Sequence, residues 1–203
     1  MTYERLTEHD ISRLALLQIS LLPGAMAAQF GTGFARSFYR YVARSAEEVL
    51  SVRRKEGEII AFCLTSFAVH SLQRRLVTRT PLPFYALLGV MTRRFWRLVI
   101  NMARDVFSGS PVFSILPEVV ILACDPQDRG RGHASQLLKE IEMTLRDRGI
   151  REYIVRTFDD DNNLAVKFYT RKGFTVIARF AAHGTSFRLM RKTLEAHAKV
   201  RIG

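Results

Sequence analysis

The chain has 203 residues, enough for one domain, and its 48% apolar and 25% charged residues are typical of a globular rather than a disordered protein. Its 31 basic and 19 acidic residues give a net charge of +12, which favours anionic partners such as phosphate-bearing cofactors, nucleic acid or a membrane surface without choosing among them. The longest apolar stretch, residues 83–91, is too short to span a bilayer.

The cysteine content and the N-terminal sequence bear on the cellular compartment. Cys63 and Cys124 lie in strand-like apolar runs, which predicts two reduced, buried thiols. The stretch MTYERLTEHD is polar from its first residues and does not resemble a signal peptide. We therefore expect a cytoplasmic protein that is at most peripheral at the inner membrane surface.

The first predicted elements are two helices. Residues 9–22 predict a helix that is capped by Asp10 and stopped by Pro23-Gly24. Apolar residues at helical spacing predict a second helix with one apolar stripe, formed by Phe30, Phe34, Phe38, Tyr41 and Val42.

A β-hairpin is predicted next. Two strand-like runs, 49–54 and 59–67, flank the turn KEGE, in which Gly57 supplies the backbone angles that such a turn needs.

Residues 72–116 interrupt the alternation of strands and helices. Residues 72–110 hold seven arginines and one acid, a net charge of +6, and 84–107 has one apolar and one arginine-rich helical face. Three interpretations stand: a helical cover that walls the acceptor cleft, a helix lying in a membrane interface, or a contact between two copies of the chain. The arginines in its middle argue against a spanning helix.

The C-terminal half alternates strands and helices again. Residues 117–126 are apolar and β-branched, which predicts a central strand buried on both faces. A helix is expected to follow up to Gly149, with a strand, a helix ended by Gly173, and a final pair of strands after it, at 151–158, 162–173, 174–182 and 186–194.

A glycine-containing loop joins the predicted central strand to its helix, with the pattern Gln127-x-x-Gly130-x-Gly132-x-Ala134. It lacks the Gly-Lys-Ser/Thr of a Walker loop and the third glycine of a dinucleotide fingerprint. Unpaired N–H groups at a helix start, approached through glycine backbone, still favour an anion, and Arg129 and Arg131 add positive charge. The alternative is a tight turn with two solvated arginines.

A second motif strengthens the interpretation as a phosphate loop. Asn162, Ala165, Tyr169, Gly173 and Phe174 match Asn-x-x-Ala-x-x-x-Tyr-x-x-x-Gly-Phe. In this order, the two motifs resemble the signature of the GNAT superfamily of acetyl-CoA-dependent N-acetyltransferases, and the likeness covers roughly 117–182.

The resemblance implies a fold and a set of contacts. The expected fold is α+β (mixed α/β), a single domain over 1–203 whose central twisted mixed sheet has helices on both faces, with a helical insertion at about 72–116. The residues implied to contact acetyl-CoA are Leu122, Ala123, Cys124, Gln127, Arg129, Gly130, Arg131, Gly132, His133, Ala134, Asn162 and Ala165.

The resemblance also implies catalytic residues. Tyr169 is the candidate general acid, because a phenol with a pKa near ~10 is mostly protonated at neutral pH and can donate to a thiolate. Glu118, eight residues before Pro126, is the candidate base, directly or through a water molecule. The alternatives are a packed helix tyrosine and a solvated carboxylate at a strand end.

No metal is expected. The run DDDNN at 159–163 is explained by the need for N-caps and acidic dipole partners where a strand leads into a helix.

The acceptor is less constrained by the sequence. Residues 20–42 resemble a branch of bacterial GNAT proteins linked to surface polysaccharide synthesis, which implies an amino sugar on a nucleotide or a lipid-linked phosphate. A protein or peptide N-acetyltransferase remains an alternative. A nucleic-acid-binding module is supported by charge alone, and a non-catalytic CoA-binding regulator is disfavoured by the presence of Tyr169 and Asn162.

Overall fold

The structure is a computed structural model that describes residues 6–22, 30–69, 71–72, 75, 116–182 and 185–195. Its strands are β1 (Glu48–Lys55), β2 (Glu58–Ser66), β3 (Glu118–Cys124), β4 (Glu152–Phe158), β5 (Thr175–Ala182) and β6 (Thr185–Thr193). Its helices are α1 (Glu8–Leu21), α3 (Gly31–Val42), α7 (His133–Asp147) and α8 (Leu164–Arg171), and a short 3-10 turn, η1, covers Pro126–Asp128.

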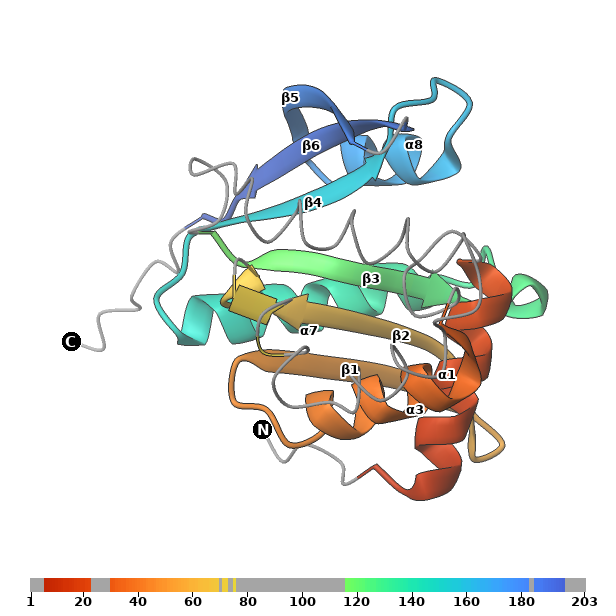
Figure 1. Cartoon of the computed structure of the whole chain (residues 1–203). Helices are drawn as coiled ribbons and strands as arrows, with labels where there is room; N and C mark the ends of the chain where they lie inside the picture. Colours follow the sequence, from red (N-terminus) through yellow and green to blue (C-terminus); the bar gives the residue numbers. More distant parts are fainter. Residues whose placement is uncertain are drawn as a thin grey trace.

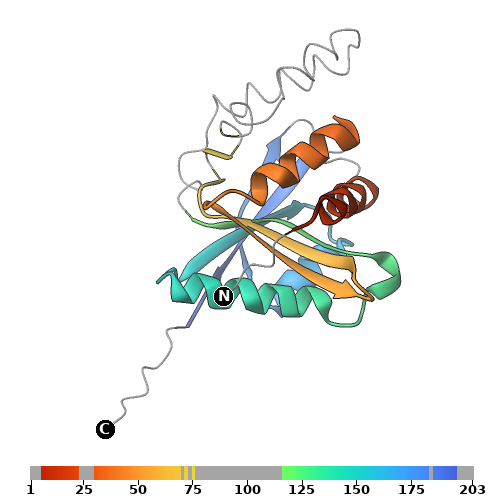
Figure 2. The same ribbon diagram turned by 90° about the horizontal axis from the view of Figure 1, so that it is seen from below.

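One six-stranded sheet organises the molecule, in the order β1-β2-β3-β4-β6-β5 (Figure 1). Neighbouring strands are antiparallel except β3 and β4, which are parallel. Helices α1 and α3 lie on one face, and α7 and α8 lie on the other (Figure 2). The mixed α/β fold expected from the sequence is thereby confirmed.

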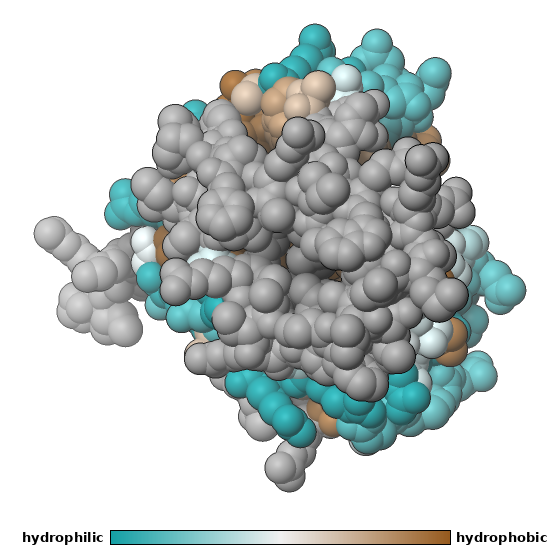
Figure 3. All heavy atoms as spheres, in the orientation of Figure 1, coloured by the Kyte–Doolittle hydropathy of each residue, from teal (hydrophilic) through white to brown (hydrophobic). Residues whose placement is uncertain are grey.

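Two buried clusters hold these layers together. In the first, which we call the α1–α3 core, helix residues such as Leu14 and Phe34 pack against Phe62 and Ile121 of the sheet. In the second, the α7–α8 core, Ile141 and Tyr169 pack against the opposite face of the sheet. From Ala61 to Leu64 of β2, successive residues belong to the two cores in alternation, as the pleat requires. In the view of Figure 3, the described surface is mainly hydrophilic.

The N-terminal helix differs in detail from the prediction. Thr7, not Asp10, is the N-cap of α1, and its hydroxyl accepts a hydrogen bond from the Asp10 N–H. Asp10 lies in the first turn, where its carboxylate accepts the Thr7 N–H at 2.8 Å. The two residues thus form a reciprocal capping box that satisfies donors at both positions. The predicted stop, Pro23-Gly24, lies outside the described residues.

The predicted hairpin is confirmed. Strands β1 and β2 pair from Glu48↔Ser66 to Lys55↔Glu58. Both turn residues, Glu56 and Gly57, have positive φ angles of 53° and 87°, which a two-residue hairpin turn of this hand requires.

The central strand is less buried than predicted. Its residues alternate between buried and half-buried, whereas β2 is buried from Ile59 to Ser66. The physical reason is that β2 is paired along its length on both sides, while β3 is paired along only part of its length with β4.

Both cysteines are free thiols, as predicted, although Cys124 is half-buried rather than buried. Burial raises the pKa of Cys63 to about 12 and also raises the pKa of Cys124. Both thiols therefore stay protonated at neutral pH, which makes neither of them a nucleophile.

Most of the predicted insertion, including 84–107, lies outside the described residues. Arg75, near its start, is anchored to the domain. Its Nε donates to the Tyr41 hydroxyl at 2.9 Å, and its guanidinium pairs with the buried carboxylate of Glu48. No helix in the described ranges has both the length and the apolar character needed to cross a bilayer.

We expect Asp10→Asn to reduce the free energy of unfolding by about 2 kcal/mol at pH 7, because it removes a buried, charge-assisted hydrogen bond. Arg54 donates to Asp10 at 2.6 Å, and this bond, with those from Thr7, holds the pKa of the Asp10 carboxyl well below its usual range. A carboxyl with a lowered folded-state pKa contributes stability above its unfolded pKa of about 4, and this contribution declines as the pH falls below that value.

Urea denaturation at pH 7 and pH 3 measures both effects, and the difference between wild type and variant should shrink at pH 3. The matched control is Glu8→Gln, which removes an exposed carboxylate from the same helical turn and should change stability far less. A difference that does not shrink with pH would refute the ionic interpretation.

Candidate functional site

The sheet separates between its two parallel strands. Pairing of β3 with β4 is confined to Glu118↔Ile154 and Val119↔Val155. On the other side of β3 the register shifts, so that Val120 has no partner in β2. This bulge bends the strand. Beyond Val119, the edge of β3 that faces β4 is therefore unpaired by any described strand.

The backbone groups at this edge can be assigned. The Asp125 N–H donates to the Ile60 carbonyl at 2.8 Å, so Asp125 faces β2. Because backbone groups alternate along a strand, Ala123 also faces β2, while Leu122 and Cys124 face the unpaired side. The Cys124 carbonyl accepts a hydrogen bond from Arg129 Nε at 3.2 Å. Within the described ranges, the N–H groups of Leu122 and Cys124 have no acceptor on that side.

The loop after β3 leads directly into α7. Gly130 and Gly132 have φ angles of +79° and +85°, which non-glycine residues adopt only with strain. Gly132 is the N-cap of α7 and provides no side chain to cap the helix. The Gln136 N–H donates to the Gly132 carbonyl at 3.0 Å, so the first three helical residues precede the hydrogen-bonded ladder.

Those first residues are His133, Ala134 and Ser135, and no described residue accepts their N–H groups. They lie at the positive end of the helix dipole, where an anion is stabilised. The loop therefore leads into a helix start with unpaired N–H groups, while its binding of a phosphate stays a prediction.

Ion pairs fix the shape of this loop. Asp128 is buried and pairs with Lys55 of the hairpin at 3.3 Å and with Arg131 at 3.2 Å. Asp125 accepts the Gln127 N–H at 3.2 Å and pairs with Arg13 of α1 at 3.2 Å. The loop is thus tied to two other elements.

The second motif places α8 beside the end of β4. Asn163 is the N-cap of α8: its side chain accepts the Ala165 N–H at 2.9 Å and donates to Thr157 Oγ1 at 3.0 Å. Asn162, the residue identified in the motif, is exposed, and its N–H donates to Asp160 at 2.8 Å. The capping function of Asn163 was missed because two adjacent asparagines cannot be distinguished by type.

The acidic run before α8 is engaged in ion pairs. Arg188 of β6 pairs with Asp159 and, at 2.5 Å, with Asp161. Arg179 of β5 lies 3.7 Å from Asp159. No group of three or more candidate metal ligands occurs in the part of the chain that the structure describes.

Tyr169 is buried in the α7–α8 core. Its ring meets those of Phe174 and Phe168 edge-on, with centroids 5.2 and 5.3 Å apart. Burial, followed by the nearby Cys63 thiol, raises its pKa well above the usual value of a phenol. The hydroxyl therefore remains protonated over the physiological pH range.

Glu118 is buried at the start of β3 and is held by Arg156 of β4. Arg156 Nε donates to one carboxylate oxygen at 2.8 Å, and Nη2 donates to the other at 2.7 Å. This fork fixes the orientation of the carboxylate. The sequence analysis did not identify Arg156, because the run REYIVRTF does not indicate which strand pairs with it.

Tyr169 and Glu118 lie on opposite faces of the sheet. Val119 and Val155 belong to the α7–α8 core together with Tyr169. Alternation along the strands therefore points Glu118 and Arg156 to the other face. The two candidate catalytic side chains therefore lie on opposite sides of the sheet, and Glu118 is in the part of β3 that is paired with β4.

The fold is similar to those of several solved structures. The chain is similar to a putative acetyltransferase of the GNAT family from Desulfovibrio desulfuricans, with 12% identity, a TM-score of 0.58, and coverage of 95% of this chain and 96% of the other. It is also similar to an aminoglycoside 6'-acetyltransferase type Ii, with 13% identity, a TM-score of 0.60 and 94% coverage of both chains.

A third similar structure is an aminoglycoside 6'-N-acetyltransferase complexed with coenzyme A, with 12% identity, a TM-score of 0.58, and coverage of 90% of this chain and 89% of the other. At these identities the likeness establishes the fold alone. No curated protein matches the sequence. Residues 19–174 match the family described as Acetyltransferase (GNAT) family, and the chain therefore belongs to the GNAT acetyltransferases.

Proposed function

We propose that this protein transfers an acetyl group from acetyl-CoA directly to a primary amine of a small molecule. One observation carries the proposal: the uncapped start of α7 lies at the end of β3, whose edge has N–H groups without acceptors in the described structure. A pyrophosphate could accept hydrogen bonds at the start of α7, and an arm that contains amide groups could pair with the edge of β3.

The residues fit coenzyme A in the following way. The N–H groups of His133 and Ala134, presented by Gly130 and Gly132, would bind the pyrophosphate. Arg131, whose side chain is 59% exposed, adds positive charge at the rim, with Gln127 exposed beside it.

The pantetheine arm would extend the sheet along β3. The backbone groups of Leu122 and Cys124 are available for this, whereas those of Ala123 face β2. Asn162 and Ala165 at the start of α8 would approach the arm from the other side. Arg129, which bonds the Cys124 carbonyl, sets the end of the free edge.

The candidate acid and the candidate base lie on opposite faces of the sheet. The amine attacks the thioester carbonyl, a C–N bond forms, and the C–S bond breaks. Glu118 would accept the amine proton, directly or through water, and Tyr169 would donate to the departing sulfur. Because the pKa of Tyr169 lies above that of a thiol near ~8.5, hydrogen-bond donation to the developing thiolate is easier than complete proton transfer.

The acceptor we favour is an amino sugar on a nucleotide or lipid carrier, supported by the resemblance of residues 20–42 to the polysaccharide-associated branch. The aminoglycoside acetyltransferases among the similar structures make an amine-bearing sugar chemically reasonable. Much of the basic charge described is paired, as in Arg54–Asp10 and Arg188–Asp159, which weakens the case for a nucleic-acid-binding module.

We expect Gly132→Trp to abolish coenzyme A binding, because a side chain at φ +85° strains the loop and an indole covers the helix start. With coenzyme A at about 100 times Kd, the wild-type Tm should rise by about 5–10 °C, and the variant's Tm should not change. Thermal-shift titration measures this.

The matched control is Gly149→Trp, at the other end of α7, where φ is +72° and the space beside Cα is equally open. It introduces the same strain and bulk roughly 20 Å away and should retain the full shift. Equal shifts in both variants would contradict the phosphate-loop assignment.

We expect Tyr169→Phe to lower kcat about 100-fold while leaving the coenzyme A thermal shift intact, because only the proton donor is removed. Release of free thiol from acetyl-CoA measures kcat. The control is Tyr153→Phe, which removes a hydroxyl from the same core, one that donates to Glu142 at 2.7 Å. Normal turnover by Tyr169→Phe would mean that the acid assignment is wrong.

We expect Glu118→Gln to lower kcat/KM for the amine about 100-fold without changing KM for acetyl-CoA, because glutamine cannot accept the proton. Rates across pH 6–9 provide the measurement. Glu142→Gln, at a buried carboxylate outside the site, is the control. A loss of threefold or less would assign proton removal to water rather than to Glu118.

A further inference from the structure

Three phenylalanine rings form a stacked row across one end of the sheet. Phe158 ends β4, and its ring lies 5.3 Å from that of Phe187 on β6, at an angle of 28°. Phe187 in turn lies 5.5 Å from Phe180 on β5, at 21°. The residues are register partners on adjacent strands, and we call them the phenylalanine row.

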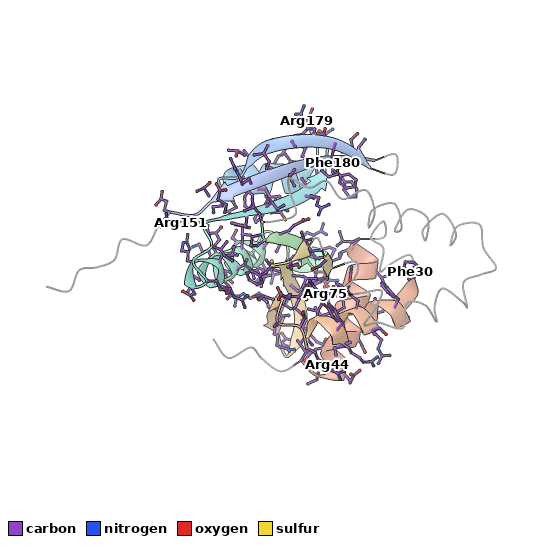
Figure 4. The ribbon with its side chains drawn as sticks, turned by 60° about the vertical axis from the view of Figure 1, so that its left-hand side comes forward. Phe30, Arg44, Arg75, Arg151, Arg179 and Phe180 are labelled. Atoms are coloured by element: carbon purple, nitrogen blue, oxygen red, sulfur yellow. The ribbon has the colours of Figure 1, made fainter. Side chains whose placement is uncertain are left out.

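The row lies on the same face of the sheet as the proposed base. Tyr153 and Val155 of β4 point into the α7–α8 core, so Arg156 and Phe158 point to the opposite face. Figure 4 shows Arg179 and Phe180 on opposite sides of β5, in keeping with this alternation. Phe158 is two residues from Arg156, roughly 7 Å along the strand.

The row is accessible and uncharged. Phe158 is 52% exposed, its two partners are half-buried, and none of the three belongs to either core. Phenylalanine rings offer no hydrogen-bonding groups, and the described charges of β3 and β4 that point to this face near Phe158, Glu118 and Arg156, are paired with each other. Such a surface favours a flat apolar group over a hydroxyl-rich or cationic one.

We propose that the phenylalanine row is the part of the acceptor site that binds a planar aromatic group. The preferred acceptor is then a primary amine that carries such a group within reach of Glu118. An aryl ring attached to the amine and the base of a nucleotide-linked amino sugar both supply this chemistry. The inference rests on the proposed function, because the acceptor must meet the acetyl group between Tyr169 and Glu118.

The test compares two primary amines, 2-phenylethylamine and hexylamine, on the full-length protein by thiol release from acetyl-CoA, with each KM expressed as the concentration of unprotonated amine because the two differ in basicity. We expect KM to be five- to tenfold lower for 2-phenylethylamine, about the contribution of one aromatic stack. Phe158→Leu keeps an apolar side chain but removes the flat face, so the ratio of the two KM values should fall to about one. Met143→Leu, at a residue that is 49% exposed on α7, is the matched control and should leave the ratio unchanged.

A second comparison distinguishes the source of the aromatic group. If a nucleotide-linked amino sugar has a lower KM than the free amino sugar, and Phe158→Leu removes the difference, the row binds the base. If the preference is seen with 2-phenylethylamine alone, the row binds an aryl ring of the amine itself.

Other results would overturn the inference. Equal KM values for both amines in the wild type would refute it. An unchanged KM ratio in Phe158→Leu would also refute it. If the Tm or the elution volume of this variant changed at the same time, the row would be a contact within the protein or between two copies of it. If coenzyme A binds but no amine yields thiol, the proposed function fails, and calorimetric titration of 2-phenylethylamine then decides the inference: weaker binding by Phe158→Leu supports it, and equal binding refutes it.

Discussion

The separation of β3 from β4 after two register pairs is the constraint on which the candidate site depends. Unpaired backbone groups in the middle of a sheet are costly unless something else binds them. Here the bulge at Val120 bends β3, and Leu122 and Cys124 present N–H groups without acceptors in the described structure. The loop that follows this strand leads to the uncapped start of α7. The unpaired N–H groups of the β3 edge and those at the start of α7 therefore follow one another along the chain.

Ion pairs to other elements hold the loop between β3 and α7 in place. Arg13 of α1 pairs with Asp125, and Lys55 of the hairpin pairs with Asp128. These contacts join elements far apart in the sequence to the loop. The basic residues of the chain are therefore used in part to build the domain.

The two candidate catalytic groups owe their properties to different environments. Tyr169 lies among aromatic rings, and burial keeps its hydroxyl protonated. Glu118 lies on the other face, where Arg156 holds both of its oxygens. In the proposed reaction, Tyr169 would donate a hydrogen bond and Glu118 would accept a proton, and the proposed acceptor would contact the phenylalanine row on the face of Glu118.

The sequence by itself determined the local features: the hairpin turn, the glycine loop and its helix, the motif around Tyr169, and the family. These depend on residues that are near neighbours in the chain, so spacing and residue type suffice. Only the tertiary structure decided that Arg156 meets Glu118 and that Phe158 stacks on Phe187, because strand pairing brings these residues together across long separations. It also decided where β3 and β4 part, since a bulge and a two-pair register leave no mark in the apolar pattern of either strand.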